Sequence, residues 1–162
     1  MLPTPSDNYF FDLLNQSPAT TSQLPVLATA ERTIKVFPDC IYHSYKSLGL
    51  AFCFTAITKP INECDPNDPV LRLNAIDIYN GTTKDGFQTY QGDLPLPCGV
   101  TPAMQAHELV SLLGEPNRKG GGGRVPCWID YKFERGGGLM IQLHGIDWED
   151  RTMGWSSLVL YQ

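Results

Sequence analysis

Gly49-Leu-Ala-Phe-Cys-Phe54 aligns without a gap on Gly138-Leu-Met-Ile-Gln-Leu143, a stretch from the other half of the chain. In both stretches a Gly-Leu pair opens a largely apolar run of strand length. The same alignment places Tyr42 on Tyr131. The sequence therefore predicts two copies of one strand-rich unit, each built around a β-hairpin.

The same order of elements extends outward from both hairpins. A helix stops near a proline in Leu13-Leu14-Asn-Gln-Ser-Pro18 and again in Leu112-Leu113-Gly-Glu-Pro116. Each half closes with an apolar strand that ends in tyrosine, at Ala75-Ile-Asp-Ile-Tyr79 and at Ser157-Leu-Val-Leu-Tyr161. Self-similarity of this kind is the signature of an internal repeat.

These signals predict an α+β fold built from two tandem α-β-β-β repeats, residues 1–81 and 82–162, in a single domain that covers residues 1–162. A helix over a hairpin and one further strand leaves a large apolar face open, and two such units can close each other's faces. The expected product is an antiparallel sheet with two helices on one face.

Local signals set several boundaries. Ser6 is placed to cap the first helix, and Thr101-Pro102 predicts the start of the second, with proline in its first turn. Residues 87–90 are expected to form a short strand in the linker between the halves. The glycine-rich residues 117–123 are expected to form a loop, followed by a strand from Val125 to Glu134.

Two short patterns carry a family resemblance. Tyr-x-Ser-Leu-Gly-Leu-x-Phe-x-Phe at 45–54 and Leu-Leu-Gly-Glu-Pro at 112–116 resemble the tandem helix–sheet repeats of the β-lactamase inhibitor proteins. The first pattern is also similar to the repeated module of the phagophore-assembly-factor family. The chain as a whole resembles uncharacterised proteins of mushroom-forming fungi. This resemblance implies the fold and a defence or inhibitor role, and it carries over no catalytic residue.

Composition restricts the classes of partner. The chain has 12 Lys and Arg against 17 Asp and Glu, a formal net charge of −5, so nucleic-acid binding is not expected. No apolar run is long enough for a membrane span.

The first residues lack the basic and apolar regions of a secretory signal, and five cysteines without a C-x-x-C pair fit a reducing compartment. We expect a cytoplasmic location.

No metal or other cofactor is expected. Cys40 and His43 have the spacing of metal ligands, but residues three apart on a strand point to opposite faces. The glycine-rich stretch Lys119-Gly-Gly-Gly-Gly-Arg124 follows a helix C-terminus, whose dipole opposes an anion. It is therefore interpreted as a flexible connection and not as a phosphate cradle.

One catalytic hypothesis remains. His144 ends a strand close to Asp147, Glu149 and Asp150, and it could form an acid–base pair with one of these carboxylates, with Arg124 as an anion contact. The alternative interpretation is a strand that runs into a solvated acidic turn. No Gly-x-Ser-x-Gly nucleophile motif is present in the sequence.

Aromatic residues of the second half point to a protein partner. On a strand, Trp128 shares a face with Asp130 and Lys132, so it is an anchor on an exposed sheet face, a large core residue, or part of a covered edge. Exposed aromatic side chains beside charges are typical of protein interfaces. The predicted partner-binding residues are Trp128, Lys119, Arg124 and Trp155.

The resulting functional prediction is a non-enzymatic protein-interaction module. It rests on the repeat architecture, on the aromatic second half and on the lack of a recognisable catalytic motif. The alternative is a small enzyme or a small-molecule-binding protein with its site between the two repeats.

Overall fold

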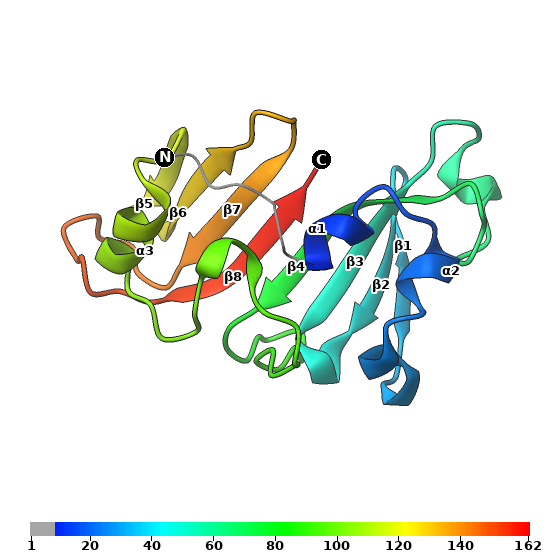
Figure 1. The fold of residues 1–162 in the computed structure, drawn as a ribbon, viewed down its shortest axis with the longest axis horizontal. Helices are drawn as coiled ribbons and strands as arrows, with labels where there is room; N and C mark the ends of the chain where they lie inside the picture. The colour runs from blue at the N-terminus through cyan, green and yellow to red at the C-terminus, as the bar shows by residue number, and fades with distance from the viewer. Residues whose placement is uncertain (1–8) are drawn as a thin grey trace.

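The structure is a computed structural model that describes residues 9–162, and an eight-stranded sheet dominates it (Figure 1). The strands are β1 (Thr33–Val36), β2 (Ile41–Tyr45), β3 (Leu50–Thr55), β4 (Arg72–Tyr79), β5 (Arg118–Gly122), β6 (Val125–Lys132), β7 (Gly138–Leu143) and β8 (Trp155–Tyr161). The α-helices are α1 (Tyr9–Leu13), α2 (Pro18–Thr21) and α3 (Ala106–Leu113). Short 3-10 helices occupy Pro25–Thr29, Lys46–Leu48, Ile61–Glu63 and Pro97–Gly99.

The prediction of an antiparallel sheet is confirmed. The spatial order is β1-β2-β3-β4-β8-β7-β6-β5, and each neighbouring pair is antiparallel. There are eight strands rather than the six that two α-β-β-β units contain. The C-terminal strand β8 lies in the centre, where it joins the first four strands to the last three.

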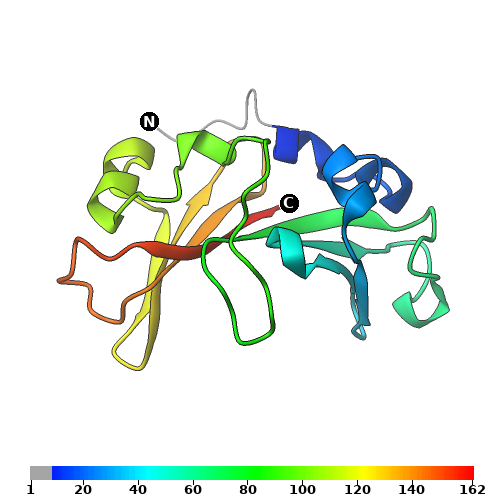
Figure 2. The ribbon, with the colours of Figure 1, turned by 90° about the horizontal axis from the view of Figure 1, so that it is seen from below.

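One face of the sheet, here called the core face, carries the apolar side chains. Its central row crosses six strands and consists of His43, Phe52, Ile76, Leu160, Leu139 and Tyr131. Phe10 and Leu13 of α1 and Leu109 and Leu113 of α3 belong to the same buried cluster. In Figure 2, α1 and α3 lie above the sheet, over different parts of it. The opposite side is called the outer face.

Several predicted elements are confirmed. The hairpin of β2 and β3 turns through Lys46–Leu48 and Gly49, which has φ 69° and whose Cβ, if present, would lie 2.4 Å from the Gln88 carbonyl oxygen. The second helix stops at Leu113 before Gly114, as expected. Tyr42 and Tyr131, however, are not equivalent, because Tyr42 lies on the outer face and Tyr131 is buried on the core face.

The predicted start of the second helix is wrong. Thr101-Pro102 lies in a turn, and α3 begins at Ala106. Gln105 is the N-cap residue: its backbone N–H donates to Glu108 Oε1 at 3.1 Å in a capping box. The Ala106 N–H donates to the Met153 carbonyl at 2.8 Å, so the loop before β8 fixes this boundary. The predicted Ser6 cap lies outside the described residues.

Two further local predictions are wrong. Residues 87–90 form no strand; Phe87 instead stacks on Tyr79 of β4 with ring centroids 4.2 Å apart. The glycine-rich segment is not a loop, because Arg118–Gly122 forms the edge strand β5 paired with β6.

None of the helices formed by residues 9–162 has the length and apolar content that crossing a bilayer requires.

Candidate functional site

The glycine-rich strand β5 is shaped by two tryptophan rings. A Cβ on Gly120 would lie 2.3 Å from the ring of Trp128, which covers the strand from the outer face. A Cβ on Gly122 would lie 3.0 Å from the ring of Trp148, which comes from the loop between β7 and β8. The glycines are therefore needed for close ring-to-backbone packing, and this packing explains why a segment of low β-propensity is a strand.

A cation lies over each of these rings. The Arg118 guanidinium carbon is 5.8 Å from the centroid of the Trp128 ring, and Lys119 Nζ is 5.1 Å from that of Trp148. Arg118 and Lys119 are consecutive on a strand, so their side chains point to opposite faces. Each tryptophan is thus held between the strand backbone and a cationic side chain.

On the outer face, Arg118 is fixed by a buried network. Its Nε and Nη2 atoms both lie 3.1 Å from Asp130 Oδ2, and the Tyr161 hydroxyl donates to Asp130 Oδ1 at 2.6 Å. Asp130 is 1% exposed. Lys119, by contrast, is exposed and makes no ion pair with any residue of 9–162.

Three large apolar side chains are exposed to solvent on the β5–β6 hairpin and on the β7–β8 loop beside it. Val125 is 56% exposed, Ile146 50% and Trp148 37%. The Gly123 N–H donates to the Ile146 carbonyl at 2.8 Å, and Trp148 Nε1 donates to the Gly121 carbonyl at 3.3 Å. These bonds hold the β7–β8 loop against the hairpin. We call the surface made by Lys119, Arg124, Val125, Ile146 and Trp148 the edge surface.

The structure separates the four predicted partner-binding residues. Lys119 and Arg124 are exposed and belong to the edge surface. Trp128 is half-buried on the other side of β5. Trp155 is 1% exposed and its Nε1 donates to the Thr101 carbonyl at 2.9 Å, so it is a core residue with no surface to offer a partner.

Val125, Ile146 and Trp148 were missed by sequence reasoning. Trp148 and Ile146 stand in a run of turn-forming and acidic residues, which is a signal of exposure. That signal does not show that the run folds back onto β5. The hydrogen bonds from the β7–β8 loop to the β5–β6 hairpin place Ile146 and Trp148 beside the hairpin that carries Val125.

The predicted catalytic residues occupy an exposed turn. The Asp147 carboxylate accepts a hydrogen bond from the Glu149 N–H at 2.9 Å, which closes the turn locally. His144 lies against Gly154, and within residues 9–162 no hydrogen bond or ion pair joins it to Asp147 or Glu149. This geometry agrees with the alternative interpretation, a strand that runs into a solvated acidic turn.

Cys40 and His43 do not form part of a metal-binding cluster among the described residues. His43 lies on the core face, and its Nε2 donates to the Pro66 carbonyl at 2.6 Å. Burial lowers the pKa of His43 to about 4, so the imidazole is neutral. Among the described residues, no three His, Cys, Asp or Glu side chains gather in a geometry that could hold a metal ion.

Asp77 is an ionisable residue of the outer face that sequence reasoning did not single out. It lies on β4 between Ala51 of β3 and Val159 of β8. Burial raises the pKa of its carboxyl to about 6. No ion pair involves Asp77 within residues 9–162, so its charge is uncompensated.

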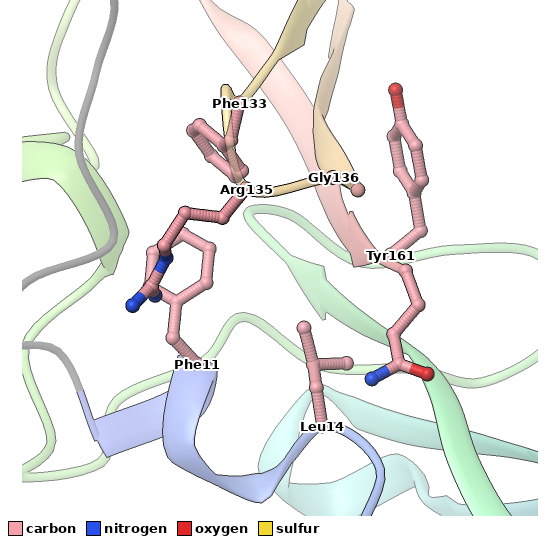
Figure 3. A pocket seen from close by; sticks show the side chains of 8 residues that line it. Phe11, Leu14, Phe133, Arg135, Gly136 and Tyr161 are labelled. Atoms are coloured by element: carbon pink, nitrogen blue, oxygen red, sulfur yellow. The ribbon is translucent and has the colours of Figure 1, made fainter.

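A cavity of about 420 Å³ opens between α1, the β6–β7 turn and residues 161–162 (Figure 3). Phe11 and Leu14 line it from α1 and the turn that follows, and Phe133, Arg135, Gly136 and Gly137 line it from the β6–β7 turn. The end of the chain at residues 161–162 completes the wall. We call it the junction cavity. None of the predicted site residues lines it.

No protein-family model matches the chain, and no solved structure matches it at a significant level. The interpretation of the edge surface and of the junction cavity therefore depends on their own geometry and chemistry.

Proposed function

We propose that the protein is a non-enzymatic interaction module that binds another protein through the edge surface. One observation carries this proposal: Val125, Ile146 and Trp148 are exposed on the β5–β6 hairpin and on the loop that is hydrogen-bonded to it, and Lys119 Nζ lies 5.1 Å from the centroid of the Trp148 ring. Exposed aromatic and aliphatic groups inside a charged rim are the composition of protein interfaces.

The edge surface is also ordered before any partner binds. The Trp148 ring is held by its hydrogen bond to Gly121 and by Lys119 above it. Immobilising a free side chain on binding costs about 0.5–1.5 kcal/mol, and this ring has already lost most of that freedom. A partner that presents an apolar side chain beside acidic groups would complement both the ring and the two cations.

A site-specific photo-crosslinking amino acid at position 125 tests the proposal. Placed in native cytosol, this variant should crosslink one partner in stoichiometric amount, and adding Trp148→Ala should abolish the product. The matched control carries the same crosslinker at position 57, where Ile57 is fully exposed on the loop between β3 and β4, outside the edge surface. Equal products from positions 125 and 57 would show non-specific capture and would refute the proposal.

We further propose that the fold consists of two copies of one helix–sheet unit. The central pairing supports this idea, because the repeated segments 75–79 and 157–161 exchange equivalent positions: Ala75 pairs with Tyr161, and Tyr79 with Ser157. An approximate two-fold axis would then pass between Asp77 and Val159, which pair with each other. Self-complementary pairing of this kind is expected of two equivalent units.

A cytoplasmic location, a protein partner in place of a nucleic acid, and the resemblance to β-lactamase-inhibitor-like repeats belong to this proposal. The net charge of −5 and the order of elements support them. The partner should be recovered from cytosol, and nuclease treatment should leave its recovery unchanged.

The alternative function, a small-molecule-binding protein with a site between the two halves, is favoured by one observation. The junction cavity lies between α1 of the first half and the β6–β7 turn of the second. The junction cavity is lined by residues that do not belong to the edge surface, among them Phe11, Phe133 and Arg135.

A further inference from the structure

The junction cavity has an apolar wall built from both ends of the fold. The rings of Phe11 and Phe133 meet edge to face, with centroids 5.2 Å apart and planes at 75°. Leu14 points into the space beside them in Figure 3. Its volume of about 420 Å³ falls within the range of small-molecule sites. The wall therefore suits one compact apolar group.

Arg135 brings a cationic side chain to this cavity. Arg135 makes no hydrogen bond or ion pair with any residue of 9–162, and its side chain extends toward Phe11 in Figure 3. A guanidinium group binds a carboxylate through two parallel hydrogen bonds. The cavity thus combines an apolar wall with an exposed cation, Arg135, among its lining residues.

The turn that carries Arg135 is fixed in place. Gly136 and Gly137 both have positive φ, at 95° and 71°, and a Cβ on Gly137 would lie 2.3 Å from the Tyr161 carbonyl oxygen. The turn therefore packs directly on the backbone at the end of β8. The Tyr161 hydroxyl donates to Asp130 Oδ1, so this side chain is held on the outer face of the sheet.

We propose that the junction cavity binds a small carboxylic acid that carries an aromatic or branched apolar group. The apolar group packs on Phe11, Leu14 and Phe133, and the carboxylate pairs with Arg135. This ligand class follows from the charge of Arg135 and the apolar side chains of the wall, and it is independent of the edge surface.

Isothermal titration calorimetry with 3-phenylpropanoate tests the proposal, with 3-phenylpropanamide as the neutral analogue. The acid should bind at millimolar concentration or tighter, and the amide about tenfold more weakly, since one charge-assisted pair is lost. Arg135→Gln should weaken binding of the acid to the level of the amide. Arg135→Lys should restore part of the affinity, because it keeps the charge and loses the two-pronged geometry.

Lys84→Gln is the matched control, since it removes an exposed cation that belongs neither to the junction cavity nor to the edge surface, and it should leave the affinity for the acid unchanged. Equal affinity for acid and amide, no effect of Arg135→Gln, or no binding of the acid at millimolar concentration would each overturn the proposal. The thermal midpoint of each variant confirms that it is folded. Partner crosslinking at position 125 is expected to be unaffected by Arg135→Gln, so either proposal can fail alone.

Discussion

At the scale of single residues, the fold places two ionisable groups on opposite faces of the sheet. His43 faces the core and Asp77 the outer face, and burial shifts both pKa values toward the neutral form. The two shifts have opposite consequences for the pH dependence of stability. Asp77 becomes charged as pH rises, whereas His43 becomes charged as pH falls.

Asp77→Asn is expected to stabilise the protein at neutral pH. The folded-state pKa of about 6 lies above the unfolded value of 3.8, so the folded state binds the proton more tightly and loses stability as pH rises through this range. The titratable groups facing Asp77 are Tyr42, Cys53 and Tyr79, which supply no positive charge. Urea unfolding should show a gain on the order of 2 kcal/mol near pH 7.5 and little gain near pH 4. A gain of equal size at both pH values would contradict this account.

His43 should produce the opposite slope. The folded-state pKa of His43 is about 4, below its usual value of 6.5. Its contribution to the free energy of unfolding is therefore fully present above pH 6.5 and is lost as pH falls from 6.5 toward 4. His43→Gln keeps a donor for the Pro66 carbonyl and removes the titration. The free energy of unfolding of this variant should fall less steeply between about pH 6.5 and pH 4 than that of the wild type. An unchanged slope would show that His43 is not neutral in the folded protein.

At the scale of elements, β5 shows how packing overrides propensity. Glycine is unfavourable in a strand, and the segment between Asn117 and Gly123 therefore predicts a loop. The strand forms because Trp128 and Trp148 cover the glycines from either side and replace the missing side chains. The start of α3 is likewise set by pairing with the loop before β8 and not by the local Thr-Pro signal.

Gly120→Ala should disrupt this edge strand. The new Cβ would lie 2.3 Å from the Trp128 ring, so the ring must move away, at a cost of about 1–3 kcal/mol. We expect a red shift in tryptophan fluorescence and a lower urea midpoint. Gly154→Ala is the matched control, because its Cβ would meet only the movable, exposed His144 ring at 3.2 Å. The idea fails if both variants match the wild type in fluorescence and in stability.

At the scale of the whole molecule, the β4–β8 pairing joins the halves. Fragments 1–81 and 82–162 would each expose an apolar sheet edge, with Ile76 and Ile78 on β4 and Leu158 and Leu160 on β8. Each fragment alone should lack a cooperative thermal transition, and a refolded mixture should regain one with the size of the intact chain. A fragment 1–81 that melts cooperatively by itself would instead indicate two independent domains.

The sequence by itself determined the antiparallel sheet, the hairpin of β2 and β3, the end of α3 and the exposure of Lys119 and Arg124. These features depend on alternation, turn residues and charge, which act between neighbours in the chain. Only the tertiary structure decided that β5 is a strand, that Trp155 is buried, and that Ile146 and Trp148 reach the β5–β6 hairpin. The junction cavity also belongs to this second group, because its walls come from opposite ends of the chain. Such contacts form between residues far apart in sequence, where no local pattern records which surfaces will meet.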